Sequence, residues 1–179
     1  MKRILIAFVM MCLALPLMAQ APTITTSKDA PVKGKKDEVK APEKIYDESI
    51  NAMVQIDKAI EEARRTNRMV ICQVGGNWCP WCIRFSQFIN QDKEIAEIVK
   101  KHFVYIHVNT SKENKNIEAL KRLGNPGRFG YPVLVILDHD GRVLHIQNSS
   151  YLEEGKTYNR KLVIDFFLNW TREAIENLK

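Results

Sequence analysis

The chain has 179 residues and a net charge of +6, from 27 basic and 21 acidic side chains, and it contains four cysteines. Its lysines are mixed with acidic residues and no nucleic-acid recognition motif follows them, so the basic excess does not indicate a nucleic-acid-binding protein. Four cysteines are also too few for the dense disulfide framework that holds small secreted domains together.

The N-terminus has the pattern of a secretory signal peptide. Lys2 and Arg3 precede an apolar stretch over residues 4–17, and small residues follow it. We predict a signal peptide at residues 1–19, cleaved after Ala19, and export to the periplasm without stable membrane insertion. A retained anchor is the less favoured alternative, because the apolar stretch is shorter than the ~20 residues that span a bilayer. Cys12 lacks the small residues that precede a lipoprotein cysteine.

The next segment, residues 20–44, mixes lysines, acidic residues and prolines. Such a composition buries too little apolar surface to offset the loss of chain entropy on folding. We therefore predict a disordered leader at residues 20–44 and one folded domain at residues 45–179.

The domain begins with a helix signal and then a strand signal. Apolar residues recur at three- and four-residue steps over residues 46–67, which predicts an amphipathic helix. The apolar run at residues 69–74 is short and rich in β-branched residues, which predicts a buried strand. Cys72 in this strand shares a face with Val70 and Val74. A buried apolar filler is favoured for Cys72 over a redox role.

Helix and strand signals alternate through the rest of the chain, which is typical of an α/β fold. The predicted elements are a helix starting at Cys79 that continues after Asp92, a strand at 103–108, a short helix at 114–123, a strand after Pro132, a hairpin turn at 138–141, a strand at 142–146 and a final helix at 159–178.

The cysteine pair in Cys79-Pro80-Trp81-Cys82 is the candidate reactive site of the chain. Two thiols separated by two residues can close and reopen a disulfide. At the start of a helix, unpaired N–H groups and the helix dipole favour negative charge, which lowers a thiol pKa from about 8.5 into the range of about 3.5 to 7.5. We therefore expect Cys79 to be the attacking sulfur and Cys82 the resolving thiol.

Trp78 before the pair, Pro80 and Trp81 inside it, a strand before it and a helix after it together resemble the active site of the thioredoxin family. A second similarity is Gly130-Tyr131-Pro132-Val133, because thioredoxin-like proteins carry a cis proline at the start of this strand. The resemblance implies a thioredoxin-like three-layer sandwich in which helices flank a central mixed β-sheet.

The resemblance also implies which residues bind substrate. Pro132 would be cis beside the dithiol, and the backbone of Tyr131 would contact the substrate chain. Trp78, Pro80 and Trp81 would shape the apolar surface around the sulfurs. Two alternatives stay open: Pro132 could begin an edge strand in trans, and Trp78 could serve packing alone.

One position departs from the family. Thioredoxin has a buried aspartate, six residues before its first cysteine, that accepts a proton near the resolving thiol. Here the position is Gln73, which cannot take a proton at neutral pH. Water or another group would then transfer the proton, or turnover would be slow. Gln73 could also be a structural polar residue, and the sequence does not place Glu94 or Glu97 near the sulfurs.

These observations predict a thiol:disulfide oxidoreductase that exchanges disulfides with exported proteins. We expect a monomer without cofactor or metal, supplied by a membrane-embedded electron donor, and a reduction potential between those of reducing and oxidising relatives. The alternatives are a polypeptide-binding module and a metallochaperone of the same fold. Zinc is disfavoured because one Cys-x-x-Cys pair lacks a second. The four histidines are scattered along the chain, at positions His102, His107, His139 and His145.

Overall fold

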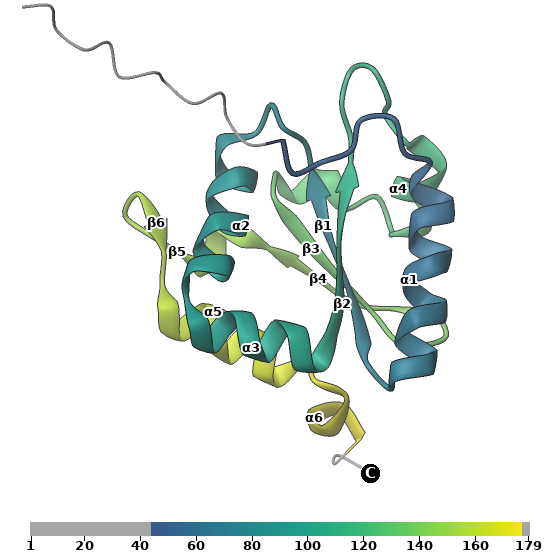
Figure 1. Ribbon diagram of the computed structural model, residues 1–179. Coiled ribbons are helices and arrows are strands. Elements are labelled where there is room, and N and C mark those ends of the chain that lie inside the picture. The colour runs from purple at the N-terminus through teal and green to yellow at the C-terminus, as the bar shows by residue number, and fades with distance from the viewer. Residues whose placement is uncertain (1–43, 177–179) are drawn as a thin grey trace, which may run out of the picture. The chain divides into compact units, whose positions relative to one another are not determined.

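The structure, a computed structural model, describes residues 44–176 (Figure 1). The helices are α1 (Ala52–Thr66), α2 (Pro80–Gln91), α3 (Lys93–His102), α4 (Ile117–Arg122), α5 (Arg160–Asn169) and α6 (Arg172–Glu176). The strands are β1 (Met69–Gly75), β2 (Phe103–Asn109), β3 (Val133–Leu137), β4 (Val143–Asn148), β5 (Glu153–Glu154) and β6 (Thr157–Tyr158). Short 3₁₀ helices occupy Pro126–Phe129 and Ser149–Leu152. The predicted signal peptide and, apart from Lys44, the predicted leader lie outside the described residues.

A four-stranded sheet in the order β2-β1-β3-β4 forms the centre of the domain described here, residues 44–176. Strand β1 is parallel to β2 and antiparallel to β3, and β3 pairs antiparallel with β4. All residues of β1 and β3 are buried, as expected for the two inner strands of a sheet that is covered on both faces. The sheet is therefore mixed, as predicted.

Helices cover both faces of the sheet, α1 and α4 on one side and α2, α3 and α5 on the other (Figure 1). Side chains alternate along β1, so that Val70, Cys72 and Val74 join the core under α1 while Met69 and Ile71 join the opposite core. The three layers confirm the predicted fold class. Within residues 44–176, no helix combines the length and apolarity needed to cross a membrane.

The first predicted helix starts later than its apolar pattern suggested. Helix α1 begins at Ala52, where the Asn51 side chain caps it by accepting the backbone N–H groups of Met53 and Val54. Asn is a strong N-cap residue because its side-chain oxygen satisfies free N–H groups of the first turn. The prediction of helix at residues 46–50 was therefore wrong. Tyr46 instead lies in a non-helical segment and is 2% exposed.

The C-terminal region also differs from the prediction of one long helix. Helix α5 ends at Asn169 and α6 starts at Arg172. Between them, the N–H of Trp170 bonds the carbonyl of Phe167, a tighter spacing than in an α-helix. The hydroxyl of Thr171 then accepts the N–H of Ala174 and caps the next helix. The small β5–β6 hairpin before α5 was not predicted, because two-residue strands leave no periodic signal.

Candidate active site

The cysteine pair lies where β1 gives way to α2. A short loop runs from the end of β1 to Cys79, and Pro80 opens the helix at its first position, where its missing N–H costs no hydrogen bond. Cys79 and Cys82 form a disulfide, with Cα atoms 5.2 Å apart. Cys79 is 4% exposed and Cys82 is fully buried. Cys79 is thus the sulfur nearer to solvent.

Cys79 is also the N-cap of α2. Its Sγ accepts the backbone N–H of Cys82 at 3.1 Å. In the reduced protein the same N–H would point at a Cys79 thiolate, and the dipole of the 12-residue helix would add to its stabilisation. This arrangement suits Cys79 for the attacking role predicted for it.

The proline loop lies beside the disulfide, as the family resemblance implied. The Tyr131-Pro132 peptide bond is cis, so the trans alternative was wrong. Because Val133 pairs with Val74, Pro132 lies next to the end of β1, where the loop to Cys79 begins. The Tyr131 ring packs edge-on against Trp78, with ring centroids 5.3 Å apart.

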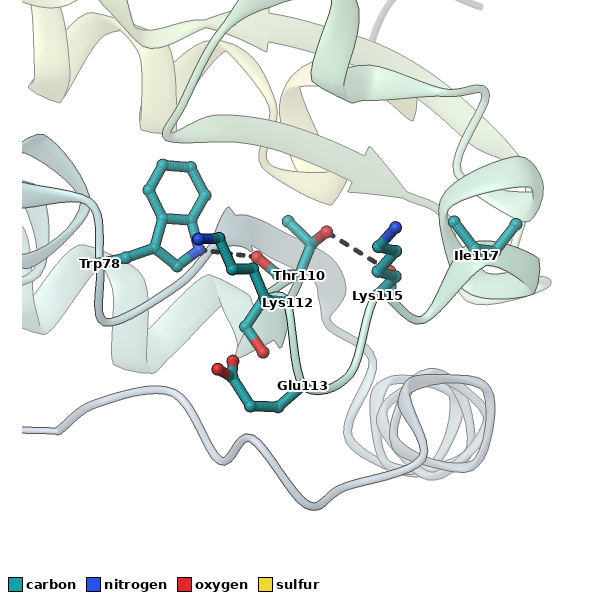
Figure 2. A pocket seen from close by; sticks show the side chains of 7 residues that line it. Trp78, Thr110, Lys112, Glu113, Lys115 and Ile117 are labelled. Carbon is teal, nitrogen blue, oxygen red and sulfur yellow. Dashed lines mark hydrogen bonds between the residues drawn. The ribbon is translucent and has the colours of Figure 1, made fainter.

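Trp78 is the exposed aromatic residue of the site. Its side chain is 54% exposed, and its Nε1 donates to the carbonyl of Thr110 at 2.7 Å. It borders a pocket of about 560 Å³ between the active-site loop and the segment that follows β2. Figure 2 shows Trp78 and Ile117 at opposite ends of this pocket and Lys112 between them. The pocket therefore offers an apolar surface beside two lysines and one glutamate, Lys112, Lys115 and Glu113.

Trp81 is held in place by its neighbours. Its ring is edge-on to that of Tyr158 at 5.4 Å, and the Arg84 guanidinium lies 4.5 Å from its centroid. The Tyr158 hydroxyl donates to the Trp81 carbonyl at 3.2 Å. Pro80, between the two cysteines, is exposed. Trp78 and Pro80 are therefore more accessible to a substrate than Trp81.

Gln73 is fully buried behind the disulfide and uses all of its hydrogen-bonding capacity. Its Nε2 donates to the Cys82 carbonyl at 3.0 Å and to the Tyr46 hydroxyl at 2.6 Å. Its Oε1 accepts from Ser86 Oγ at 3.1 Å and from the Tyr105 hydroxyl at 2.5 Å. Gln73 thus ties β1, β2, α2 and the segment before α1 together. This supports the structural interpretation of Gln73, since an amide transfers no proton at neutral pH.

His107 adjoins this network. Its Nε2 lies 2.9 Å from Ser86 Oγ, which donates to Gln73. Since the serine proton is used in that bond, the histidine nitrogen must be the donor. Burial lowers the pKa of His107 to about 4, so the ring is neutral at pH 7. His107 is therefore a neutral hydrogen-bond donor in this site.

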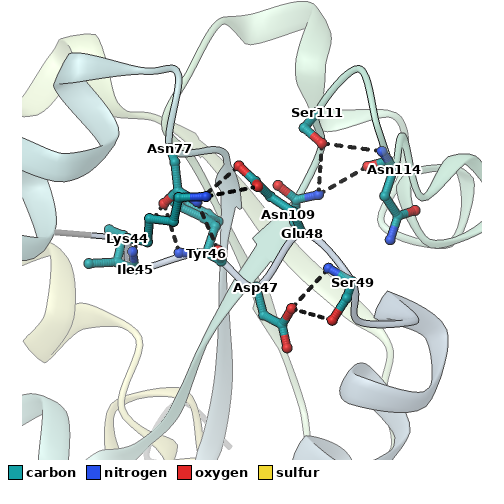
Figure 3. A network of polar contacts seen from close by, with 10 residues as sticks. All are labelled: Lys44, Ile45, Tyr46, Asp47, Glu48, Ser49, Asn77, Asn109, Ser111 and Asn114. Carbon is teal, nitrogen blue, oxygen red and sulfur yellow. Dashed lines mark hydrogen bonds and ion pairs between the residues drawn. The ribbon is translucent and has the colours of Figure 1, made fainter. Parts of the chain in front are cut away.

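Two residues of the site, Tyr46 and Asn77, were not predicted from the sequence. Asn77 Oδ1 accepts the backbone N–H groups of Ile45 and Tyr46, each at 3.0 Å. Its Nδ2 donates to the Tyr46 carbonyl at 2.8 Å and to Glu48 at 3.1 Å (Figure 3). Asn77 therefore holds the Tyr46 segment against the active site. The available signal was an amide residue in the loop just before the dithiol.

The remaining candidate residues have roles other than disulfide exchange. Cys72 is a free, buried cysteine whose pKa burial raises to about 12, which agrees with the predicted role of core filler. Glu94 pairs with Arg160 of α5. Across residues 44–176, histidines, cysteines and carboxylates do not gather into a group of three that could hold a metal ion.

Comparison with known proteins agrees with this geometry. Residues 51–139 match a family model described as thioredoxin-like. The structure is similar to a disulphide isomerase from Xylella fastidiosa Temecula1, with a TM-score of 0.62 and 25% identity, covering 69% of this chain and 94% of that one. It is also similar to a thioredoxin from Thermus thermophilus, with a TM-score of 0.50 and 17% identity, covering 69% and 88%. No curated protein sequence matches closely enough to count as a relative.

The sheet order, the disulfide at the start of α2 and the cis proline beside it define a thioredoxin fold that carries a Cys-x-x-Cys disulfide. The family match and the similar structures lead to the same class. This chain is a thioredoxin-like protein.

Proposed function

We propose that this protein is a thiol:disulfide oxidoreductase acting on exported proteins, with Cys79 as nucleophile and Cys82 as resolving thiol. The observation that carries the proposal is the Cys79–Cys82 disulfide at the N-terminus of α2, where the less buried sulfur accepts a helix N–H. The similarity to a disulphide isomerase at 25% identity supports the same reaction class.

The reaction proceeds by two exchanges. In the reducing direction, the Cys79 thiolate attacks one sulfur of a substrate disulfide, forms a mixed disulfide and expels the other substrate sulfur as a thiolate. The Cys82 thiolate then attacks Cys79 Sγ, closes the internal disulfide and releases the second substrate sulfur. Two electrons pass to the substrate, whose two thiolates take protons from solvent. The reverse sequence oxidises a substrate dithiol.

The reduction potential determines which direction operates. We propose a value between about −270 mV, the level of thioredoxin, and about −120 mV, the level of the oxidase DsbA. Trp81 inside the cysteine pair brings no positive charge of its own to stabilise a thiolate. We further propose that a membrane-embedded donor supplies electrons in the periplasm and that the protein works as a monomer.

The substrate of this proposal is a polypeptide. Its backbone would lie along Tyr131 and Pro132, and one apolar side chain would enter the pocket beside Trp78 (Figure 2). The charged residues of the pocket lining are Lys112, Lys115 and Glu113, and the net positive charge favours a substrate with an acidic residue near that side chain. Pro80 and Trp81 complete the surface around the disulfide.

Reduction of insulin in the presence of dithiothreitol tests the proposal. We expect the wild-type chain to accelerate precipitation of the insulin B chain, and Cys79→Ser to lower the rate at least about a hundredfold, because a serine hydroxyl does not exchange with disulfides. When the reduced Cys82→Ser protein is mixed with insulin after removal of dithiothreitol, it should accumulate a mixed disulfide visible on a non-reducing gel. Cys72→Ala is the matched control and should keep the wild-type rate. Full activity in Cys79→Ser would refute the assignment.

A further inference from the structure

The hydrogen-bonding pattern of Gln73 determines the direction in which the Tyr46 hydroxyl points. The Cys82 carbonyl can only accept a hydrogen bond, so the Gln73 atom 3.0 Å from it must be the amide nitrogen. The same nitrogen therefore donates to Tyr46 Oη at 2.6 Å. A phenolic oxygen that accepts this bond keeps its own proton for another partner.

Cys82 Sγ and the Tyr46 hydroxyl lie on the same side of Gly75, without a hydrogen bond between them in the disulfide form. Tyr46, Cys79 and Cys82 form one buried cluster behind the disulfide. A Cβ atom placed on Gly75 would overlap Cys82 Sγ and would come within 2.9 Å of Tyr46 Oη, so both atoms border the same point. Within residues 44–176, no oxygen or nitrogen accepts the proton of the Tyr46 hydroxyl. Cys82 Sγ, which borders the same point, is the acceptor that opening of the disulfide would offer to this hydroxyl.

Within residues 44–176, the fixed positive charge near Cys82 is the Arg84 guanidinium, which lies over the Trp81 ring. The titratable side chains packed around Cys82 and Gln73 are Tyr46, Tyr105, Tyr158, His107 and Cys72. Burial raises the pKa values of the tyrosines and of Cys72 and lowers that of His107, so all five are neutral at pH 7. A thiolate formed at Cys82 therefore depends on hydrogen bonds for its stabilisation.

We propose that Tyr46 is a catalytic residue whose hydroxyl donates a hydrogen bond to the Cys82 thiolate when the disulfide opens. The inference rests on the exchange reaction proposed above. In the disulfide form Cys82 Sγ is bonded to Cys79 Sγ and is a weak acceptor. When that bond breaks, the sulfur carries a negative charge and becomes a strong one. Asn77 fixes the donor by binding the backbone on both sides of Tyr46.

The step balances without another reactant. A substrate thiolate attacks Cys79 Sγ, the bond between the two cysteine sulfurs breaks, and Cys82 Sγ keeps the electron pair as a thiolate. The Tyr46 proton stays on its oxygen and is shared with the sulfur, since burial makes the phenol a poor acid. In the opposite direction the same bond holds Cys82 as a thiolate, ready to attack the mixed disulfide at Cys79.

The test is the pKa of the Cys82 thiol in a Cys79→Ser background. Serine is itself a favoured N-cap residue, so α2 keeps its start. The alkylation rate by iodoacetamide is followed against pH, and mass spectrometry assigns the label to Cys82 by fragment ions. Tyr46→Phe keeps the ring and removes only the hydroxyl. A hydrogen bond to a charged group contributes about 1.5 kcal/mol or more, so we expect the pKa of Cys82 to rise by about 1 unit.

The control is Tyr158→Phe, which removes another buried hydroxyl that bonds a carbonyl of α2. It should leave the pKa of Cys82 within about 0.3 units of the parent, a range small against the ~1 unit expected above. In the protein with both cysteines, Tyr46→Phe should slow the attack of Cys82 on the mixed disulfide about threefold. A higher pKa makes each Cys82 thiolate more nucleophilic, but the smaller fraction of Cys82 present as thiolate outweighs this gain.

The outcomes separate the two proposals. An unchanged Cys82 pKa in Tyr46→Phe, or an equal rise in Tyr158→Phe, overturns the role of Tyr46. The alkylation measurement needs no turnover, so it gives this answer even if the wild-type chain fails to reduce insulin. Absence of insulin reduction by the wild-type chain would instead refute the proposed function.

Discussion

The two sulfurs of the disulfide lie in very different surroundings. Beside Cys79, Trp78 and Pro80 are exposed to solvent, and Trp78 borders an open pocket. Behind Cys82, Gln73 and Tyr46 are buried and every hydrogen bond of the Gln73 amide is used. The side of Cys79, called here the outer side, can therefore accommodate different polypeptides. On the side of Cys82, called here the inner side, the hydrogen bonds fix the buried side chains in one conformation. Substitutions on the inner side should affect folding stability, and substitutions on the outer side should affect substrate binding.

The largest expected effect comes from filling the inner side. Gly75→Ala places a Cβ atom against Cys82 Sγ and Tyr46 Oη. The disulfide fixes the sulfur and Asn77 fixes the Tyr46 backbone, so neither can move away easily. We expect a loss of about 3 kcal/mol in the free energy of unfolding, the upper end for overpacked cores, measured by urea denaturation of the oxidised protein.

The control for Gly75→Ala is Gln87→Ala, at an exposed position of α2. It should change the free energy of unfolding by less than about 0.5 kcal/mol, as surface substitutions usually do. Equal stability of Gly75→Ala and wild type would mean that the space behind the disulfide is not closed.

A smaller effect should appear with pH. His107 has a pKa of about 4 in the folded protein and about 6.5 when unfolded. Below pH 6.5 the unfolded chain therefore binds more protons, and stability is lost as the pH falls from about 6.5 towards 4. Between pH 7 and 4.5, wild type should lose about 2 kcal/mol more unfolding free energy than His107→Gln. Parallel pH profiles of the two proteins in urea denaturation would contradict a neutral, buried His107.

The smallest effect on stability is expected on the outer side. Trp78→Ala should raise KM for a polypeptide substrate about fivefold, because it removes an apolar contact surface worth about 1 kcal/mol. The free energy of unfolding should fall by less than about 1 kcal/mol, since the ring is 54% exposed. Leu162→Ala, an exposed apolar position on α5, is the control. A Trp78→Ala protein with unchanged KM but much lower stability would support the packing alternative.

Features carried by local patterns could be predicted from the sequence. Strand β1 follows from a short β-branched run, and α2 follows from the cysteine pair with proline at its first position. The cis bond before Pro132 followed from the family resemblance, since proline is the residue for which a cis bond costs little. These predictions needed only neighbouring residues or a known motif.

Features that depend on distant contacts could not be predicted. Tyr46 continues the apolar spacing of α1, but Asn77, 31 positions away, removes it from the helix by binding its backbone. The partners of Gln73 likewise come from three separate segments of the chain, the stretch before α1, α2 and β2. A single sequence shows that Gln73 replaces the family's aspartate, but it does not show which groups surround it.

The Asn77 contacts make the beginning of the described chain a part of the candidate active site. A protein shortened to begin at the first residue of α1 would keep all six helices named above and every strand of the four-stranded sheet. It would lose Ile45, Tyr46 and Glu48, which contact the Asn77 side chain. Such a shortened protein would retain both cysteines but expose the back of the disulfide to water. The boundary chosen for expression would then decide the chemistry that is measured.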